Sequence, residues 1–492
     1  MEEWPGCKAH ARIPVSTPAG IIAEGTLTLD SSAQERAAAV LARLDRLPGT
    51  RHVWLLVAVL SLGGMFEFYD LFMTAYVIPG LMKAGILANV SVSIFKGPAL
   101  FVAATFTGLF IGTFVFGYVA DQYGRRTIFT YSMLWYSAAT LVMAFQDTGL
   151  GVSLWRLIAG IGIGVELVTI DTYLSELVPR SIRGRAFAFN QTIQFAVVPL
   201  VALVAYLLVP ASPLGVDGWR WVVLIGSAGA LAVWFIRRGL PESPRWLINK
   251  GRLDEAEAVT ASIEAKVIAD LGSGRLPKPA GHSVEKAEPL GRLSEIFTPA
   301  YRGRTIMLMV FQFFQTFGFY GFAAWVPTLI AQQAGINLGA SLLYSFIIAI
   351  ANPFGPLLAM TFADRFERKW QLVAAAICIG VFGMLFSFQS TMPLLILFGV
   401  LLTLSNNVLS YAFHGYQTEL FPTRVRARAV GFTYSLSRIS AVFASFIIAF
   451  FLHTAGTKGV FAVIAFAMLM VVISIGGWGP KTRNRELEQI SR

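Results

Sequence analysis

The sequence contains few charged residues for its length. Of 492 residues only 14% are Asp, Glu, Lys or Arg, whereas soluble domains carry about a quarter. This scarcity excludes a chain of soluble domains, because so few charges do not cover their surfaces. It also excludes a disordered chain, which needs low hydrophobicity and high net charge. With 55% hydrophobic residues and a mean hydropathy of +0.64, a polytopic membrane protein is the class that remains.

Cysteine and the common enzyme motifs are scarce as well. The two cysteines are Cys7, in a polar segment, and Cys378, in an apolar run, so neither a disulfide framework nor a metal site is expected. The sequence lacks GxxxxGK[ST], HExxH, CxxC and GxSxG, the usual supports of ATP-driven transport and of hydrolysis. We therefore expect no enzyme, no catalytic residue, no metal and no cofactor.

Acidic residues are fewer than basic ones, 28 against 39, which gives a net charge of +11. A basic balance can indicate nucleic-acid binding. Here the basic residues stand in short clusters between apolar runs, a pattern typical of membrane topology, so no nucleic-acid partner is expected. The first fifty residues contain no apolar core of a signal peptide, which predicts a cytosolic N-terminal tail.

Twelve apolar runs are long enough to cross a membrane, since about 20 apolar residues span the hydrocarbon core. They form two sets of six around a polar stretch at 237–303. We predict an all-α membrane protein with six-helix bundles at 53–236 and 304–479 and cytosolic tails at 1–52 and 480–492. The runs fall near 54–80, 98–119, 127–145, 153–177, 186–210, 220–236, 304–331, 339–363, 370–389, 393–418, 428–452 and 459–478.

The polar stretch between the two sets is expected to be cytosolic. Its segment Leu253 to Ile268 has helical periodicity, and 271–292 reads as a linker rich in Gly, Pro and Ser. Basic residues are concentrated in the loops on the same side, which places both termini inside. These residues are Arg125, Arg126, Arg180, Arg183, Arg185, Arg365, Arg368, Lys369, Arg424, Arg426 and Arg428. We expect a monomer in the plasma (inner) membrane, surrounded by the lipid bilayer.

The two halves of the chain repeat at a fixed offset of 243 residues. This shift maps Asp121 and Arg125 onto Asp364 and Arg368, and it maps a second motif in the same way. In that motif Glu176, Leu177, Pro179, Arg183, Arg185 and Phe189 match Glu419, Leu420, Pro422, Arg426, Arg428 and Phe432. Parallel six-helix repeats are the architecture of transporters that bind substrate between their halves.

Four motifs carry a family resemblance. The loop Gly117-Tyr-Val-Ala-Asp-Gln-Tyr-Gly-Arg-Arg126 resembles the signature loop of the major facilitator superfamily. Arg156 followed by GIGIG, the run Pro241-Glu-Ser-Pro-Arg-Trp-Leu247 and the run Glu419-Leu-Phe-Pro-Thr423 resemble its sugar, metabolite and organic-ion porters. The resemblance covers about 50–480 and implies a secondary transporter that works by alternating access.

The resemblance also implies a cytosolic gate built from loop charges. Carboxylates at helix ends would pair with neighbouring arginines or face positive helix N-termini, and these contacts would break when the cytosolic side opens. In the second half Met360 and Glu367 replace the two glycines of the loop motif. The predicted gate residues are Asp121, Arg125, Arg126, Glu176, Arg183, Glu242, Arg245, Asp364, Arg368, Glu419 and Arg426.

Ionisable residues at bilayer depth are costly and are functional candidates by default. Glu67, Asp70 and Thr74 share one face of the first predicted helix, and repulsion between two carboxylates favours a bound proton. The resemblance matches Asp70 and Arg156 to an interacting pair of proton-coupled sugar porters. We predict that Asp70, Glu67, Glu166 and Arg156 take part in proton coupling. A static ion pair between helices is the alternative.

Arg438 lies about ten residues into the eleventh predicted helix, or ~15 Å at 1.5 Å per residue. The stretch Tyr434 to Ser440 resembles organic-anion porters, in which an arginine here binds the negative charge of the substrate. A guanidinium fork suits a carboxylate. The alternative is that Arg438 pairs with an internal carboxylate such as Glu166 or Asp171.

Other polar and aromatic residues of the predicted helices are expected to shape the substrate site. In the family the first, fourth, seventh and tenth helices line the cavity. The candidates are Tyr69, Gln191, Gln194, Gln312, Gln315, Tyr320, Trp325, Asn407, Tyr411 and His414. The Gly-Pro and Trp that sugar porters carry near Tyr411 and His414 are missing.

These observations predict a proton-coupled symporter of a small organic anion, of the aromatic or sugar acid type. The partners would be that anion, protons and the lipid bilayer. Three alternatives stay open. A sugar or polyol porter would show competition by neutral sugars, a drug exporter would confer resistance when overexpressed, and a non-transporting receptor would bind ligand without counterflow.

Overall fold

The computed structural model describes residues 31–88, 90–92, 95–179, 181–237, 239–272, 276–278, 293–362, 366–421 and 423–482. Within these ranges nine helices are long and apolar enough by themselves to cross a membrane. The helices α4 and α7 and the second half of the long α16 complete the twelve crossings that the apolar runs predict. The prediction of an all-α membrane protein is therefore confirmed.

The first bundle contains six long helices. They are α2 (Arg51–Lys83), α3 (Gly97–Tyr123), α4 (Arg125–Met143), α5 (Gly149–Leu177), α6 (Arg183–Leu208) and α7 (Gly218–Arg237). A small antiparallel hairpin of β1 (Ser91–Val92) and β2 (Phe95–Lys96) precedes α3. The 3-10 turn η1 (Pro213–Gly215) precedes α7.

The second bundle is more broken than the first. It contains α10 (Arg302–Ala323), α11 (Val326–Ala334), α12 (Leu338–Ala349), α13 (Phe354–Phe362), α14 (Arg368–Phe388), α15 (Met392–Glu419), α16 (Thr423–Ile473) and the short elements η2 (Leu293–Phe297) and η3 (Ser474–Trp478). The predicted runs 304–331 and 339–363 are each interrupted near a proline, Pro327 and Pro353. Proline removes a backbone donor and biases the preceding residue away from the helical region. At Gly456 (φ 65°) α16 changes direction.

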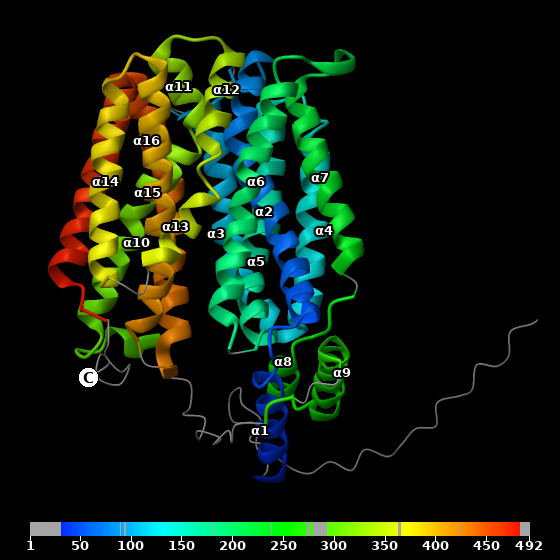
Figure 1. Cartoon of the computed structure of the whole chain (residues 1–492). Helices are drawn as coiled ribbons and strands as arrows, with labels where there is room; N and C mark the ends of the chain where they lie inside the picture. Colours follow the sequence, from blue (N-terminus) through cyan, green and yellow to red (C-terminus); the bar gives the residue numbers. More distant parts are fainter. Residues whose placement is uncertain are drawn as a thin grey trace, which may run out of the picture.

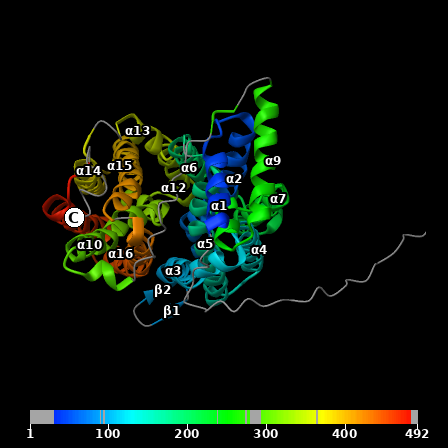
Figure 2. The ribbon, with the colours of Figure 1, turned by 90° about the horizontal axis from the view of Figure 1, so that it is seen from below.

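The two bundles stand side by side, and three further helices cover one end of the first bundle (Figure 1). These are α1 (Ser31–Asp45), α8 (Pro244–Asn249) and α9 (Leu253–Leu271). The helix α1 was not predicted, because the sequence pattern assigns residues 1–52 to a tail. Its buried residues Ala37 and Val40 pack with Trp246 and Leu253 in a separate small core. Seen from below, α1 and α9 lie together beside α2 (Figure 2).

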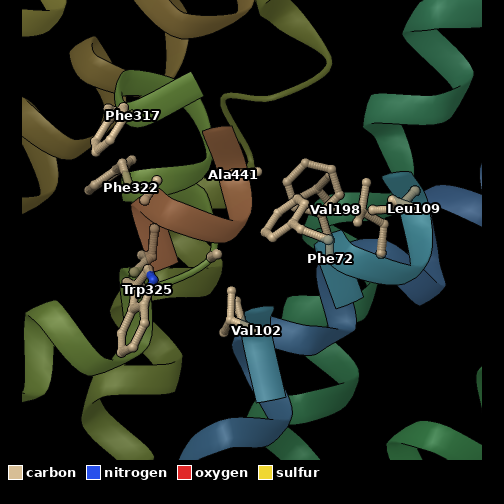
Figure 3. Packing of buried hydrophobic residues seen from close by; sticks show 14 of the residues in the cluster. Phe72, Val102, Leu109, Val198, Phe317, Phe322, Trp325 and Ala441 are labelled. Carbon is tan, nitrogen blue, oxygen red and sulfur yellow. The ribbon is translucent and has the colours of Figure 1, made fainter. Parts of the chain in front are cut away.

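The halves meet along a limited set of helices. In the interface α3 packs on α16, α6 packs on α12 and α13, and α2 packs on α11. Close to this interface Phe72 and Val198 of the first half and Phe322 and Trp325 of the second belong to one buried cluster (Figure 3). Any central site therefore lies between the two bundles, next to these helices.

Candidate functional site

A buried ion pair joins four helices of the first half. Nη1 of Arg156 in α5 lies 2.9 Å from a carboxylate oxygen of Asp70 in α2. The guanidinium also donates to the Asp70 carbonyl and to the hydroxyls of Thr74 and Thr105, at 2.7 to 3.0 Å. Thr140 in α4 donates to the other Asp70 oxygen at 3.1 Å. The pair is thus satisfied by residues of one half alone.

The glycine run after Arg156 explains how the arginine reaches its partners. A Cβ atom on Gly160 would lie 2.6 Å from the Thr105 carbonyl oxygen, and one on Gly164 would lie 2.4 Å from the Leu109 carbonyl oxygen. Only glycine permits this approach of α5 to α3. Small residues drive helix packing in lipid in this way. The run GIGIG is thus a packing surface that brings Arg156 against Thr105.

A second buried arginine, Arg438 in α16, has different partners. Its Nη1 donates to the Tyr320 hydroxyl at 2.7 Å, and its Nη2 donates to the Tyr434 hydroxyl at 2.8 Å. The guanidinium carbon also lies 4.8 Å from the centre of the Tyr434 ring. Within the ranges that the structure describes, no ion pair joins Arg438 to a carboxylate, and its Nε has no hydrogen-bond partner.

Three further acidic residues were predicted near the centre. Glu67 in α2 and Glu166 in α5 are fully buried, whereas Asp171 is exposed. Neither Glu166 nor Asp171 forms an ion pair with Arg438. Glu67, which belongs to the opposite half, attracts the charge of Arg438, but in the described part of the chain no ion pair joins these two side chains. An interaction between Glu67 and Arg438 was not predicted.

The hydroxyls around Arg438 have a consequence for anion binding. Each tyrosine oxygen accepts a hydrogen bond from the guanidinium, so its own proton is left to donate to a further group. Hydrogen bonds to charged groups are stronger than neutral ones. An anion beside Tyr320 and Tyr434 would therefore meet two hydroxyl donors polarised by a buried cation. Tyr434 was outside the predicted set, although it lies one helical turn before Arg438.

The predicted glutamines occupy two places. In the second half, Gln312 donates to Gln417 in α15 at 3.0 Å, and Gln315 donates to Gln312 at 3.3 Å. They form an amide chain within one bundle, and Gln417 is a member that the sequence did not single out. In the first half, Gln194 is buried against Gly64 of α2, and Gln191 is half-buried.

Two predicted aromatic residues lie inside their own bundles. Tyr69 donates to the Val222 carbonyl of α7 at 2.9 Å and packs on Gly226, so it points away from the second half. Trp325 is buried where α10 ends and α11 begins. Both residues shape the bundles at the level of the candidate site.

The predicted residues of α15 also differ in surroundings. Asn407 donates to the backbone and side-chain oxygens of Asn352, at 3.0 and 3.2 Å, and so holds the break between α12 and α13. The ring of His414 stacks on Phe413 and lies 5.9 Å from the ring of Tyr434. His414 is therefore close to the arginine site, and Tyr411 is half-buried on the same helix.

The end of the first half that α1, α8 and α9 cover (Figure 1) contains several of the predicted gate residues. Arg125 pairs with Glu176 at 3.1 Å. Glu242 accepts the backbone N–H groups of Arg125, Arg126 and Ser243 at 2.9 to 3.2 Å, a carboxylate at a helix N-terminus that favours negative charge. Both contacts lie within one half, so in this structure they brace the loop and do not link the halves.

Asp45, at the end of α1, pairs with two of the predicted gate residues, which the sequence did not indicate. Its carboxylate lies 2.8 Å from Arg245 and 3.5 Å from Arg183. Arg183 begins α6 and Arg245 lies in α8, so α1 is tied to both. Asp45 lay in the predicted tail, where nothing in the pattern distinguished it from other solvated charges.

The corresponding end of the second half has a matching but altered arrangement. Arg368 pairs with Glu419 at 2.8 Å. Glu367, which stands where the first half has Gly124, accepts the backbone N–H of Thr482 at 2.8 Å. Tyr173 and Tyr416, which are 243 residues apart, donate to the carbonyls of Pro241 and Pro480 respectively. The repeat thus extends to the segments that follow each bundle. The side chains of Asp121 and Arg426, and all of Asp364, lie outside the described residues.

Comparison with known proteins agrees with this architecture. The family model described as sugar (and other) transporter matches residues 56–492. YyaJ of Bacillus subtilis (strain 168), named as a metabolite transport protein, is 30% identical over 90% of this chain and 96% of its own length. The niacin transporter NiaP of Acinetobacter baylyi is 27% identical over 92% of this chain and 99% of its own length.

The fold is that of a solved transporter. The xylose transporter XylE from E. coli, in a partially occluded inward-open conformation, superposes with a TM-score of 0.71 at 20% identity, over 88% of this chain and 99% of that one. Another structure of the same protein is described as a member of the major facilitator superfamily. This chain therefore belongs to the sugar (and other) transporter family, and it is a multi-pass membrane transporter of metabolites with the major facilitator fold.

Proposed function

We propose that this chain is a proton-coupled symporter of a small organic anion in the plasma (inner) membrane, and that Arg438, Tyr320 and Tyr434 bind the carboxylate of the substrate. The observation that carries the proposal is the state of Arg438. Arg438 is 1% exposed, and its hydrogen-bond partners among the described residues are two neutral hydroxyls. A buried charge is normally paired, and a substrate anion would supply that pairing.

Glu67, which is fully buried in α2, is the first candidate for the proton carrier. Glu67 and a bound substrate would compete for the attraction of the same cation, Arg438. Once the substrate carboxylate has taken that place, a proton on Glu67 removes the excess negative charge from a site of low polarity. Substrate and proton would then enter together and leave together. Asp70 and Glu166 are the alternative proton carriers.

The relatives support an anionic substrate without naming it for this chain. One is named a niacin transporter and another an arabinose-proton symporter. A substrate that has a carboxylate and is transported together with protons is consistent with both names. A sugar or polyol remains the competing substrate class, and a panel of ligands separates the classes.

The anion role is tested by counterflow in proteoliposomes with wild type, Arg438→Gln and Arg438→Lys. Benzoate, gluconate and xylose serve as competitors, so that aromatic acids, sugar acids and neutral sugars are compared. We expect competition by at least one acid in the wild type and its loss in Arg438→Gln, with partial retention in Arg438→Lys. Competition by xylose alone, unchanged in Arg438→Gln, would show a sugar porter.

The proton role is tested by acidification of liposomes that contain a pH-sensitive dye. Glu67→Gln should exchange substrate but should no longer move protons with it, because the amide has no ionised form. Asp70→Asn and Glu166→Gln are measured beside it, and Glu35→Gln, an exposed residue of α1, is the control. If Glu67→Gln keeps wild-type proton flux and Asp70→Asn loses it, the carrier is Asp70.

A further inference from the structure

A cavity lies between the halves. Residues of α2, α6, α10, α11, α12 and α15 line it, together with the α12–α13 break. Its walls are of two kinds. One is apolar and contains Phe72, Val198, Phe319 and Phe322. The other is polar and contains Ser345, Asn352, Thr403, Asn406 and Asn407.

Most of the polar wall is occupied by hydrogen bonds within the protein. Ser345 and Thr403 donate to backbone carbonyls one turn earlier, at 2.7 and 2.8 Å. Asn352 donates to the Ala349 carbonyl at 3.0 Å, and Asn407 donates to Asn352. These four side chains hold α12, its break and α15 in place.

Asn406 is the exception on this wall. Its side chain is 4% exposed, and its Oδ1 is buried without a hydrogen-bond partner in the described part of the chain. A buried polar atom without a partner is destabilising, so natural structures rarely keep one without a reason. A ligand group in the cavity would supply the missing bond.

The cavity adjoins the anion site through a second, smaller one. The smaller cavity is lined by Thr74, Thr105, Phe106 and Tyr320. Phe72 and Ala323 line both cavities, and Tyr320 is bonded to Arg438. A ligand whose carboxylate meets the Tyr320 hydroxyl can therefore extend its body past Phe72 towards Asn406.

Aromatic rings from both halves surround the space between the two ends. Phe106 of α3 lies 4.6 Å from Tyr320 between ring centres. Phe72 of α2 and Phe195 of α6 lie 6.5 and 6.3 Å from Phe319. Such edge-to-face contacts favour a flat aromatic body. A polyhydroxylated body would bury several hydroxyls against these rings without partners, which is unfavourable.

From this geometry we propose that Asn406 determines specificity for a neutral hydrogen-bonding group at the end of the substrate remote from its carboxylate. The substrate class is then aromatic acids with a second polar group, such as a hydroxyl or a ring nitrogen. The proposal rests on the proposed function, since the carboxylate must be bound at Arg438, and it selects aromatic over sugar acids.

The test measures binding of single ligands to the purified full-length protein in detergent by calorimetry. The probes are benzoate, 4-hydroxybenzoate, pyridine-3-carboxylate and gluconate. The variants are Asn406→Ala, Asn406→Ser and Arg438→Gln. The control is Ser405→Ala, because Ser405 is the preceding residue of α15 and donates to the Leu401 carbonyl. A melting curve without ligand shows that each variant is folded, and the smaller Asn406→Ser change covers the case in which Asn406→Ala does not fold.

We expect the wild type and Ser405→Ala to bind at least one of the two polar aromatic acids about tenfold more tightly than benzoate, the size of one hydrogen bond. Asn406→Ala should lose that preference and keep its affinity for benzoate within about twofold. The inference is wrong if both Asn406 variants still bind the polar aromatic acids more tightly than benzoate. It is also wrong if gluconate binds more tightly than the aromatic acids and loses affinity in Arg438→Gln. The proposed function stands in both cases, whereas it fails if Arg438→Gln binds every acid as tightly as the wild type.

Discussion

Arg156 and Arg438 are both buried, but their charges have different partners. Arg156 is fully buried, and its charge is balanced by Asp70 in an adjoining helix and by hydroxyls of the same half. Arg438 is almost equally buried, but its contacts are the rings and hydroxyls of two tyrosines. Removing a charge from water costs several kcal/mol unless close partners offset it. The first arginine has these partners, and the second would gain them from a ligand.

The difference teaches where each arginine acts. All contacts of the Arg156 cluster lie in α2, α3, α4 and α5, so the cluster keeps its geometry when one half moves against the other. Arg438 lies in α16, which packs on α3 of the opposite half, so its surroundings would change if one half moved against the other. We therefore assign stability chiefly to Arg156 and binding chiefly to Arg438.

The largest effect on stability should come from replacing Arg156, the cation that pairs with Asp70. Arg156→Met leaves Asp70 buried with only the Thr140 hydroxyl, and breaking a buried pair in this way costs about 3–5 kcal/mol. We expect a large fall in the melting temperature in detergent, with part of the loss recovered in the double variant Asp70→Asn, Arg156→Met. If Arg438→Met lowers the melting temperature as much as Arg156→Met does, the proposed difference between the two arginines is wrong.

The next effect concerns the arginine that lacks a bonded carboxylate. Arg438→Gln should weaken binding of an acid substrate by about 10- to 150-fold, which corresponds to about 1.5–3 kcal/mol for hydrogen bonds to a charged group. Its melting temperature without ligand should stay close to that of the wild type, because no buried carboxylate loses an ion-pair partner. Calorimetry and a thermal scan on one preparation measure both quantities. A variant that binds normally but unfolds early would reverse the two assignments.

The amino-acid sequence was sufficient for much of the fold and for less of the site. Apolar runs located the crossings, and the 243-residue repeat related the halves. Gly160 and Gly164 belong to a glycine run of the kind that is typical of close helix packing in membranes. The partners of Arg438 were less predictable, since Tyr320 comes from α10, 118 residues earlier in the chain. Contacts of that kind depend on how helices far apart in the sequence pack within a bundle, and no local pattern of period 3.6 records them.

A smaller effect tests the tyrosines themselves. Tyr434→Phe removes the hydroxyl that accepts from Arg438 and keeps the ring that lies against the guanidinium. We expect affinity for an acid to fall about five- to tenfold, the size of one hydrogen bond, with the same change in Tyr320→Phe. Tyr131→Phe is a control, because Tyr131 is an exposed residue of α4 that lines neither cavity. Equal losses in all three variants would show that the effect does not come from the hydroxyls that contact Arg438.

The smallest effect concerns charges that are paired near water, where α1 meets α9. Glu264 accepts from Arg46 at 2.8 Å and pairs with Arg43. Burial opposes ionisation there, but the two arginines outweigh it and hold the pKa of Glu264 below its usual value. A lowered folded-state pKa stabilises the protein above the unfolded pKa of about 4.3, and the contribution is lost as pH falls through the folded pKa. Glu264→Gln should therefore cost about 1 kcal/mol at pH 7 and converge with the wild type below pH 4. Melting temperatures measured between pH 7 and pH 4 would follow this convergence. If the melting temperatures of Glu264→Gln and the wild type differed by the same amount at every pH, Glu264 would contribute by packing. The ion pairs with Arg43 and Arg46 would then add little to stability.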